Sequence, residues 1–67
     1  MKIGFSGLGA MGAPMTRRLA EAHPGDVLGY DADAGLASRV CLETGAGQAA
    51  SIAEIAAASD VLFSCLP

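Results

Sequence analysis

At 67 residues, the chain is shorter than most independently folding domains. Hydrophobic residues make up 52% of it and charged residues only 16%, which is an apolar composition for so short a chain. Because a small domain exposes proportionately more surface, we expect part of this apolar surface to contact segments that the sequence does not contain. We therefore interpret the chain as the N-terminal portion of a larger protein.

Charge and apolar patterning exclude several classes of function. The formal net charge is -3, only four residues are lysine or arginine, and the few aromatic residues are scattered, so nucleic-acid binding is not expected. The longest uncharged stretch, residues 3–16, is too short to span a membrane and is rich in glycine. A glycine turn explains this stretch better than a signal peptide would, so we expect a cytoplasmic protein that is not bound to a membrane.

The histidine and the cysteines indicate neither a metal site nor a disulfide framework. Cys41 and Cys65 form no CxxC motif, and both are expected to be small buried side chains in a reducing compartment. His23 is the only histidine and falls at a predicted helix end, where it is expected to face solvent. A metal site needs several ligands close together, and the sequence offers no such cluster.

The first element is a short strand that leads through a glycine turn into a helix. Residues 3–5 form the strand, Ser6 closes it, and the helix is predicted over residues 10–22. The apolar residues at helical spacing are expected to face the sheet, and they are Met11, Met15, Leu19 and Ala22. The charged residues of the helix are expected to face water, and they are Arg17, Arg18 and Glu21. Residues 23–25 end the helix with a proline and a glycine.

A second strand, a second helix and a weak third strand follow. Residues 26–31 form an apolar strand that suits a parallel sheet covered on both faces. Asp33 is expected to cap a helix that carries Leu36, Val40 and Cys41 inward and stops near Gly45. Residues 47–50 are a poor strand by propensity, but the alternation of strands and helices requires a short strand there.

The last helix and strand complete an alternating pattern. Ser51 and Glu54 form an S-x-x-E capping box for a helix over residues 52–59, so we interpret Glu54 as a cap rather than a catalytic acid. Residues 61–65 form the fourth strand, and Leu66 and Pro67 follow at its carboxyl end. The β-α-β-α-β-α-β order predicts the N-terminal part of a Rossmann-type, doubly wound parallel α/β sheet, in which strands 1 and 4 flank the ligand-binding switch point.

The turn after the first strand carries the strongest functional signal. Gly7, Gly9 and Gly12 have the G-x-G-x-x-G spacing, which alone could be only a flexible turn. Gly7 allows a sharp turn, Gly9 lets a pyrophosphate approach the backbone, and Gly12 lets the helix pack tightly on the strand. The first-turn N–H groups and the helix dipole would face the anion, and Pro14 is tolerated because it removes no intrahelical hydrogen bond.

An acidic residue after the second strand favours a dinucleotide site. Asp31 follows the glycine turn by roughly 20 residues and can accept hydrogen bonds from the adenosine ribose hydroxyls. A 2′-phosphate would meet like charge there, and no basic residue lies nearby in sequence. We therefore predict a site for NAD(H), with NADP(H) as the less favoured alternative. The predicted cofactor-binding residues are Gly7, Leu8, Gly9, Ala10, Met11, Gly12, Asp31, Leu66 and Pro67.

The whole chain resembles the start of the β-hydroxyacid dehydrogenase family, the group of 3-hydroxyisobutyrate dehydrogenase and tartronate semialdehyde reductase. The matching segments are IGFSGLGAMGAPM, GYD and DVLFSCLP, and the last carries the Leu66–Pro67 pair that lies beside the cofactor in that family. Arg18 departs from the family, which commonly has asparagine before the leucine found here as Leu19. The resemblance implies hydride transfer between nicotinamide and a short 3-hydroxy acid or its semialdehyde.

The resemblance also implies that the catalytic residues lie outside this chain. The family's catalytic lysine and its helical substrate domain would follow Pro67, and Lys2, which begins the first strand, cannot be matched to that lysine. Residues 1–67 are thus expected to be a partial NAD(P)-binding domain that is inactive alone, and the parent protein is expected to be a homo-oligomer. The alternatives are an imine reductase or 6-phosphogluconate dehydrogenase relative, a nucleotide-binding sensor without catalysis, and a Rossmann-like methyltransferase, which the glycine spacing disfavours.

Overall fold

The structure, a computed structural model, describes residues 1–64, and Cys65, Leu66 and Pro67 lie outside the described residues. Strands and helices alternate strictly along the chain. The strands are β1 (Ile3–Ser6), β2 (Val27–Tyr30), β3 (Gly47–Gln48) and β4 (Val61–Ser64), and the helices are α1 (Gly12–Ala22), α2 (Ala34–Thr44) and α3 (Ile52–Ala58). All strand pairings are parallel, and the sheet order is β3-β2-β1-β4. The predicted Rossmann-type α/β arrangement is confirmed.

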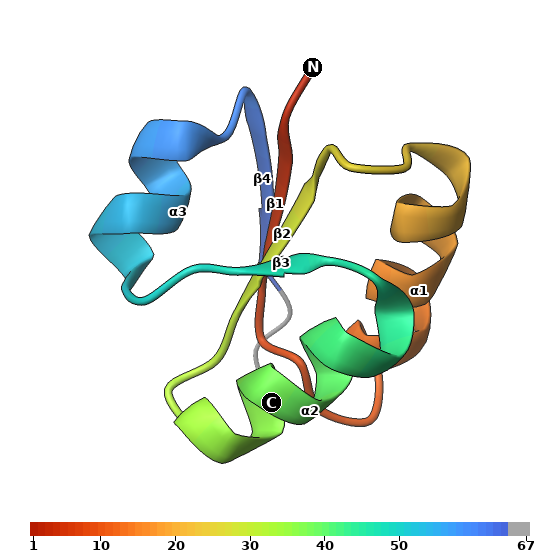
Figure 1. Ribbon diagram of the computed structural model, residues 1–67. Coiled ribbons are helices and arrows are strands. Elements are labelled where there is room, and N and C mark those ends of the chain that lie inside the picture. Colours follow the sequence, from red (N-terminus) through yellow and green to blue (C-terminus); the bar gives the residue numbers. More distant parts are fainter. Residues whose placement is uncertain (65–67) are drawn as a thin grey trace.

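The helices cover both faces of the sheet. Figure 1 shows α3 on one side of the strands and α1 on the other, and α2 packs against α1 and against β2 and β3. After β3 the chain crosses to the far side of β1, where α3 leads it into β4. The direction of winding therefore reverses between β1 and β4, and a ligand site is expected where the carboxyl ends of these strands lie.

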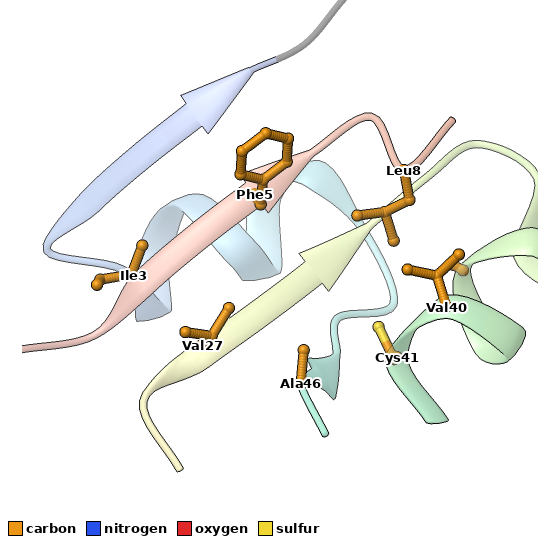
Figure 2. Close-up of a cluster of buried hydrophobic side chains, with 8 residues drawn as sticks. Ile3, Phe5, Leu8, Val27, Val40, Cys41 and Ala46 are labelled. Carbon is orange, nitrogen blue, oxygen red and sulfur yellow. The ribbon is translucent and has the colours of Figure 1, made fainter. Parts of the chain in front are cut away.

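The main core lies between the sheet and the α1–α2 layer. Figure 2 shows most of its side chains, and the cluster consists of Ile3, Phe5, Leu8, Val27, Ala37, Val40, Cys41 and Ala46. Phe63 of β4 extends this core, because its ring stacks on that of Phe5 with the centroids 6.2 Å apart. Cys41 is buried and unpaired by disulfide, as expected for a small core side chain, and burial raises the pKa of its thiol.

Helix α1 faces the sheet with small residues, so the predicted methionine stripe was wrong. Met11 and Met15 are 70% and 48% exposed, and Ala22 is also exposed. The buried residues of the helix are instead Gly12 and Thr16. Leu19, which was predicted to face inward, does pack partly against the core, together with Ala13 and Ala20. The inward face thus differs from the predicted one by about one residue, or roughly 100° around the helix axis. The predicted charged residues of the helix do face solvent.

The helix ends agree closely with the sequence. Asp33 caps α2 by accepting a first-turn N–H at 3.1 Å, and Gly45 ends that helix with a left-handed φ of 84°. Ser51 accepts the N–H of Glu54 at 3.0 Å, and the Glu54 carboxylate accepts the N–H of Ala50 rather than that of Ser51. None of the helices within residues 1–64 is both long enough and apolar enough to cross a membrane.

The two outer strands of the described sheet are β3, which is short, and β4, which is exposed. Strand β3 is shorter than the predicted 47–50, although the N–H of Ala49 still donates to the carbonyl oxygen of Gly29 at 2.9 Å. Strand β4 pairs only with β1 among the described residues. Its apolar side chains remain 38–43% exposed, and they are Val61, Leu62 and Phe63. An unpaired apolar edge of this kind is prone to association.

Candidate cofactor-binding site

The glycine turn joins β1 to α1 at the carboxyl edge of the sheet. Gly7 has a φ of 95°, a conformation that residues with a side chain rarely adopt. The N–H of Gly7 donates to the carbonyl oxygen of Tyr30 at 2.9 Å, so the turn begins as a continuation of the β1–β2 ladder. A second hydrogen bond of 3.0 Å, from the N–H of Ala13 to the carbonyl oxygen of Gly9, connects the turn to the helix. Both ends of the turn are therefore fixed by main-chain bonds.

Gly9 and Gly12 occupy opposite environments within this turn. A Cβ placed on Gly12 would overlap the carbonyl oxygen of Gly7 and would lie 3.2 Å from the ring of Phe5. The start of α1 and the turn therefore touch through main-chain atoms, and only glycine fits between them. A Cβ placed on Gly9 would meet no atom within 4 Å. Gly9 thus borders open space from which a ligand can approach the backbone.

Asp31, the first residue after β2, is bound directly to the glycine turn. One carboxylate oxygen accepts the N–H of Leu8 at 2.9 Å, and the other accepts the N–H of Asp33 at 2.9 Å. These main-chain donors, with that of Asp33 the stronger influence, hold the pKa of the Asp31 carboxyl below its ordinary value of 3.8. The side chain is therefore ionised at neutral pH and places a fixed negative charge beside the turn.

Leu8 supports the turn from the inside. Its side chain is fully buried and lies against Gly29 of β2. Leu8 is one of the predicted cofactor-binding residues, but its N–H is already bound to Asp31 and is not available to a pyrophosphate in this structure. Within residues 1–64, the N–H groups without a hydrogen-bond acceptor at this turn are those of Gly9, Ala10, Met11 and Gly12. These groups, at the positive end of α1, remain available to an anion.

A pocket of about 700 Å³ opens beside the turn and collects these groups. Its lining within the described residues is Ser6, Gly7, Gly9, Ala10, Met11, Gly12, Tyr30, Asp31, Ala32, Ile52 and Ser64. No lysine or arginine is among these described lining residues. The predicted Leu66 and Pro67 lie outside the described residues, and the other predicted positions all line the pocket except Leu8, which is fully buried.

A second, smaller hollow lies elsewhere and has a different character. It measures about 340 Å³, lies between α1 and α2, and contains neither a turn residue nor Asp31. Both signs of charge line it, from Arg17, Arg18, Glu21 and Glu43. The larger pocket is therefore the one that combines free main-chain donors with a perturbed carboxylate, which are the features of a ligand site.

Sequence reasoning missed one wall of the larger pocket. Tyr30 and Ala32 flank Asp31 and could have been included with it. Ile52 is less obvious, because it lies 21 residues beyond Asp31 in a predicted helix. The available signal was topological: a helix that follows a parallel strand begins at the carboxyl edge of the sheet, where the glycine turn also lies.

Comparisons with known proteins agree with this geometry. The family model described as the NAD binding domain of 6-phosphogluconate dehydrogenase matches residues 2–67. A solved protein of Mycobacterium avium 104, named as an oxidoreductase, is 39% identical with a TM-score of 0.83, and the match covers 98% of this chain and 23% of that one. Psf3, solved in complex with NADP+ and 2-OPP, is 32% identical with a TM-score of 0.83, over 97% of this chain and 22% of that one. The search of curated proteins gave no match.

Proposed function

We propose that this chain, which belongs to the family of the NAD binding domain of 6-phosphogluconate dehydrogenase, binds the adenosine diphosphate half of a nicotinamide dinucleotide. Its resemblance to the NAD(P)-binding portion of the β-hydroxyacid dehydrogenase-like family is confirmed at this level. The observation that carries the proposal is the pocket that both the open backbone at Gly9 and the ionised side chain of Asp31 line. Free N–H donors and a fixed acceptor are what a pyrophosphate and a ribose respectively require.

The pyrophosphate is assigned to the main chain of the turn. The N–H groups of Gly9, Ala10, Met11 and Gly12 are free within the described residues and lie at the N-terminus of α1. A helix N-terminus of this kind favours anions through both its donors and its dipole. The Leu8–Asp31 hydrogen bond holds the turn in this conformation, so little reorganisation is needed on binding.

The adenosine ribose is assigned to Asp31. Each carboxylate oxygen accepts one main-chain N–H and retains capacity for a further donor, so the ribose hydroxyls can bind without displacing Leu8 or Asp33. A 2′-phosphate would instead face an ionised carboxylate with no basic side chain among the described lining residues. We therefore propose NAD(H) as the cofactor. NADP(H) is the second candidate, because the similar Psf3 was solved with NADP+.

The activity of the whole protein is proposed from the family. The chain spans less than a quarter of the length of the solved structures that it matches. We propose that the parent protein is an NAD(P)-dependent oxidoreductase that acts on a short 3-hydroxy acid or its semialdehyde, with an imine reductase or a 6-phosphogluconate dehydrogenase relative as the alternative. The cofactor supplies or accepts the hydride, and residues 1–67 hold its adenosine end. The 67-residue chain alone is expected to show no hydride transfer, and measurable turnover by it would contradict this assignment.

Fluorescence titration with NADH and NADPH tests the proposal. Asp31→Asn keeps the shape of the side chain but removes its charge, and it is expected to weaken NADH binding by about tenfold, since hydrogen bonds to charged groups contribute about 1.5–3 kcal/mol. Asp26→Asn makes the same charge change at the opposite, amino end of β2, where Asp26 contacts Lys2, and should leave NADH affinity unchanged.

Two results of this titration would contradict the proposal at different levels. If the wild-type chain is folded by circular dichroism and binds neither cofactor, the dinucleotide assignment is wrong. If it binds NADPH more tightly than NADH, the assignment of NAD(H) is wrong while the dinucleotide site stands.

A further inference from the structure

Met11 carries a large apolar side chain that contributes little to the fold. It is 70% exposed and occupies the N-cap position of α1, where it makes no side-chain capping hydrogen bond. A capping side chain would also find no donor there, because the N–H of Ala13 already donates to the carbonyl oxygen of Gly9 and Pro14 has no N–H. The side chain of Met11 is therefore held neither by the core nor by the end of the helix.

Met11 differs from the other two methionines in lining the pocket beside the glycine turn. Met15 lies one turn later on the same flank of α1 and is 48% exposed, but it does not line this pocket. Met1 is 72% exposed and precedes β1, so it lies at the amino edge of the sheet, away from the turn. All three side chains are accessible to a small oxidant, and a change at Met11 is the one that a ligand in the pocket would meet.

We propose that Met11 is a modification site at which oxidation by a peroxide weakens dinucleotide binding. This inference rests on the proposed function, because its consequence requires the dinucleotide to bind in this pocket. The sulfur lone pair attacks one oxygen of hydrogen peroxide, and the O–O bond breaks as the S–O bond forms. The proton of the transferred oxygen passes to the leaving hydroxide. Sulfur loses two electrons and the peroxide gains them, so one sulfoxide and one water are formed.

The sulfoxide oxygen changes what this part of the pocket offers to an anion. Methionine is apolar, whereas its sulfoxide carries a strong acceptor and no donor. A pyrophosphate at neutral pH also offers only acceptors. The sulfoxide oxygen therefore either takes a free N–H group of the turn from the pyrophosphate or is covered by the ligand without a partner. Both outcomes lower the affinity for the dinucleotide.

The buried thiol of Cys41 does not react in place of Met11. Burial raises the pKa of this thiol, so at neutral pH it stays in the protonated form, which is a poor nucleophile toward peroxide. The thioether of Met11 has no proton to lose and its side chain is exposed, so it reacts without any opening of the fold. Sulfoxide reductases return the product to methionine at the expense of thiols, which makes the modification reversible.

Tandem mass spectrometry tests the position of Met11 without any substitution. When the chain is treated with dilute hydrogen peroxide, Met11 and Met15 should each gain one oxygen. Saturating NAD+, which has no hydride to lose to the oxidant, should slow the oxidation of Met11 and leave the rate at Met15 unchanged. An equal rate at Met11 with and without bound NAD+, or no oxidation of Met11 where Met15 is oxidised, would overturn the inference.

Fluorescence titration with NADH, after removal of the peroxide, measures the consequence for binding. The oxidised wild-type chain should bind NADH at least about fivefold more weakly than the untreated chain, which is the lower end of the effect of one unpaired polar group. Its Tm by circular dichroism should be unchanged, because Met11 is exposed in the fold. A methionine sulfoxide reductase with its thiol reductant should restore the affinity.

Two leucine substitutions assign the effect to one side chain. Met15→Leu should lose NADH affinity on oxidation as the wild type does, whereas Met11→Leu should have the same affinity before and after peroxide. Each variant is compared with itself, so any direct effect of the substitution on binding cancels. Both variants keep Cys41 and Cys65, so oxidation of a thiol would affect them equally.

The outcomes separate this inference from the proposed function. Unchanged NADH affinity in a chain whose Met11 is fully converted to the sulfoxide overturns the inference and leaves the dinucleotide site standing. Equal losses of affinity in Met11→Leu and Met15→Leu after peroxide also overturn it, because the effect would then come from another residue. A folded, untreated wild-type chain that does not bind NADH overturns the dinucleotide site and the inference together.

Discussion

Substitution of Gly12, the third glycine of the turn, should lower the stability of the fold. In Gly12→Ala, the new Cβ would overlap the carbonyl oxygen of Gly7, lie 2.9 Å from the carbonyl carbon and 3.2 Å from the Phe5 ring. Two of these atoms belong to the main chain and cannot rotate away. The helix α1 must therefore move off the turn, which also disturbs the packing of the buried Thr16 one turn later.

The expected cost is large for a chain of this size. Overpacking of a well-packed site typically costs 1–3 kcal/mol, and contacts with main-chain atoms place Gly12→Ala near the upper end, at about 3 kcal/mol. At the usual stability per residue, a 67-residue chain has a free energy of unfolding of about 3–10 kcal/mol. Gly12→Ala should consequently lower Tm by about 12–24 °C, since each kcal/mol corresponds to about 4–8 °C in a small domain.

Gly9→Ala is the matched variant that should have the opposite effects. Its Cβ meets no atom within 4 Å and the φ of Gly9 is not positive, so the free energy of unfolding should stay the same or rise by up to about 1 kcal/mol. The methyl group would, however, project from the backbone where the pyrophosphate is proposed to lie, and NADH affinity should fall by at least about tenfold.

Urea denaturation followed by circular dichroism, together with NADH titration, measures both effects. A Gly12→Ala variant as stable as wild type would refute the close contact between α1 and the turn. A Gly9→Ala variant that binds NADH normally would refute the assignment of the pyrophosphate to this turn.

Three further predictions concern stability and association. Because hydrogen bonds lower the pKa of Asp31 in the folded chain, its ionisation stabilises the fold above about pH 3.8, and this contribution is lost as the pH falls through the lower folded pKa. Asp31→Asn should therefore make the free energy of unfolding depend less on pH in the acid range. An unchanged pH dependence in this variant would contradict the reasoning. Ser51→Ala should lower the free energy of unfolding by about 1 kcal/mol, whereas Ser38→Ala, on the exposed face of α2, should not lower it. Equal free energies of unfolding for the two variants, measured by urea denaturation, would show that the cap of α3 contributes nothing. Leu62→Lys on the open edge of β4 should reduce self-association measured by sedimentation velocity. Leu42→Lys, at an exposed position on α2, is the control and should leave self-association unchanged. A wild-type chain that remains monomeric at high concentration would exclude association through this edge.

The features that local chemistry determines were predicted well. Each of these features depends on residues within four positions of one another. They are the caps at Asp33 and Ser51, the end of α2 at Gly45 and the position of Asp31 after β2. The strand order follows from the doubly wound Rossmann pattern that the glycine motif indicates, in which strands 1 and 4 flank the switch point. The Leu8–Asp31 hydrogen bond could not be predicted in this way, because it joins residues 23 positions apart whose relative placement depends on the β1–β2 register.

The wrong face of α1 shows how the glycine motif could have corrected the periodicity. Apolar spacing alone favours Met11 and Met15, because they are the largest apolar residues at helical intervals. The third glycine, however, is useful for tight packing only if it points at the strand, so Gly12 itself defines the inward side of the helix. The positions that share this side are four and eight residues later, at Thr16 and Ala20, and both are small enough for the close approach that Gly12 begins. Met11 is left at the mouth of the pocket, so steric demand at one backbone contact outweighs the hydrophobicity of Met11 and Met15 in setting the inward face.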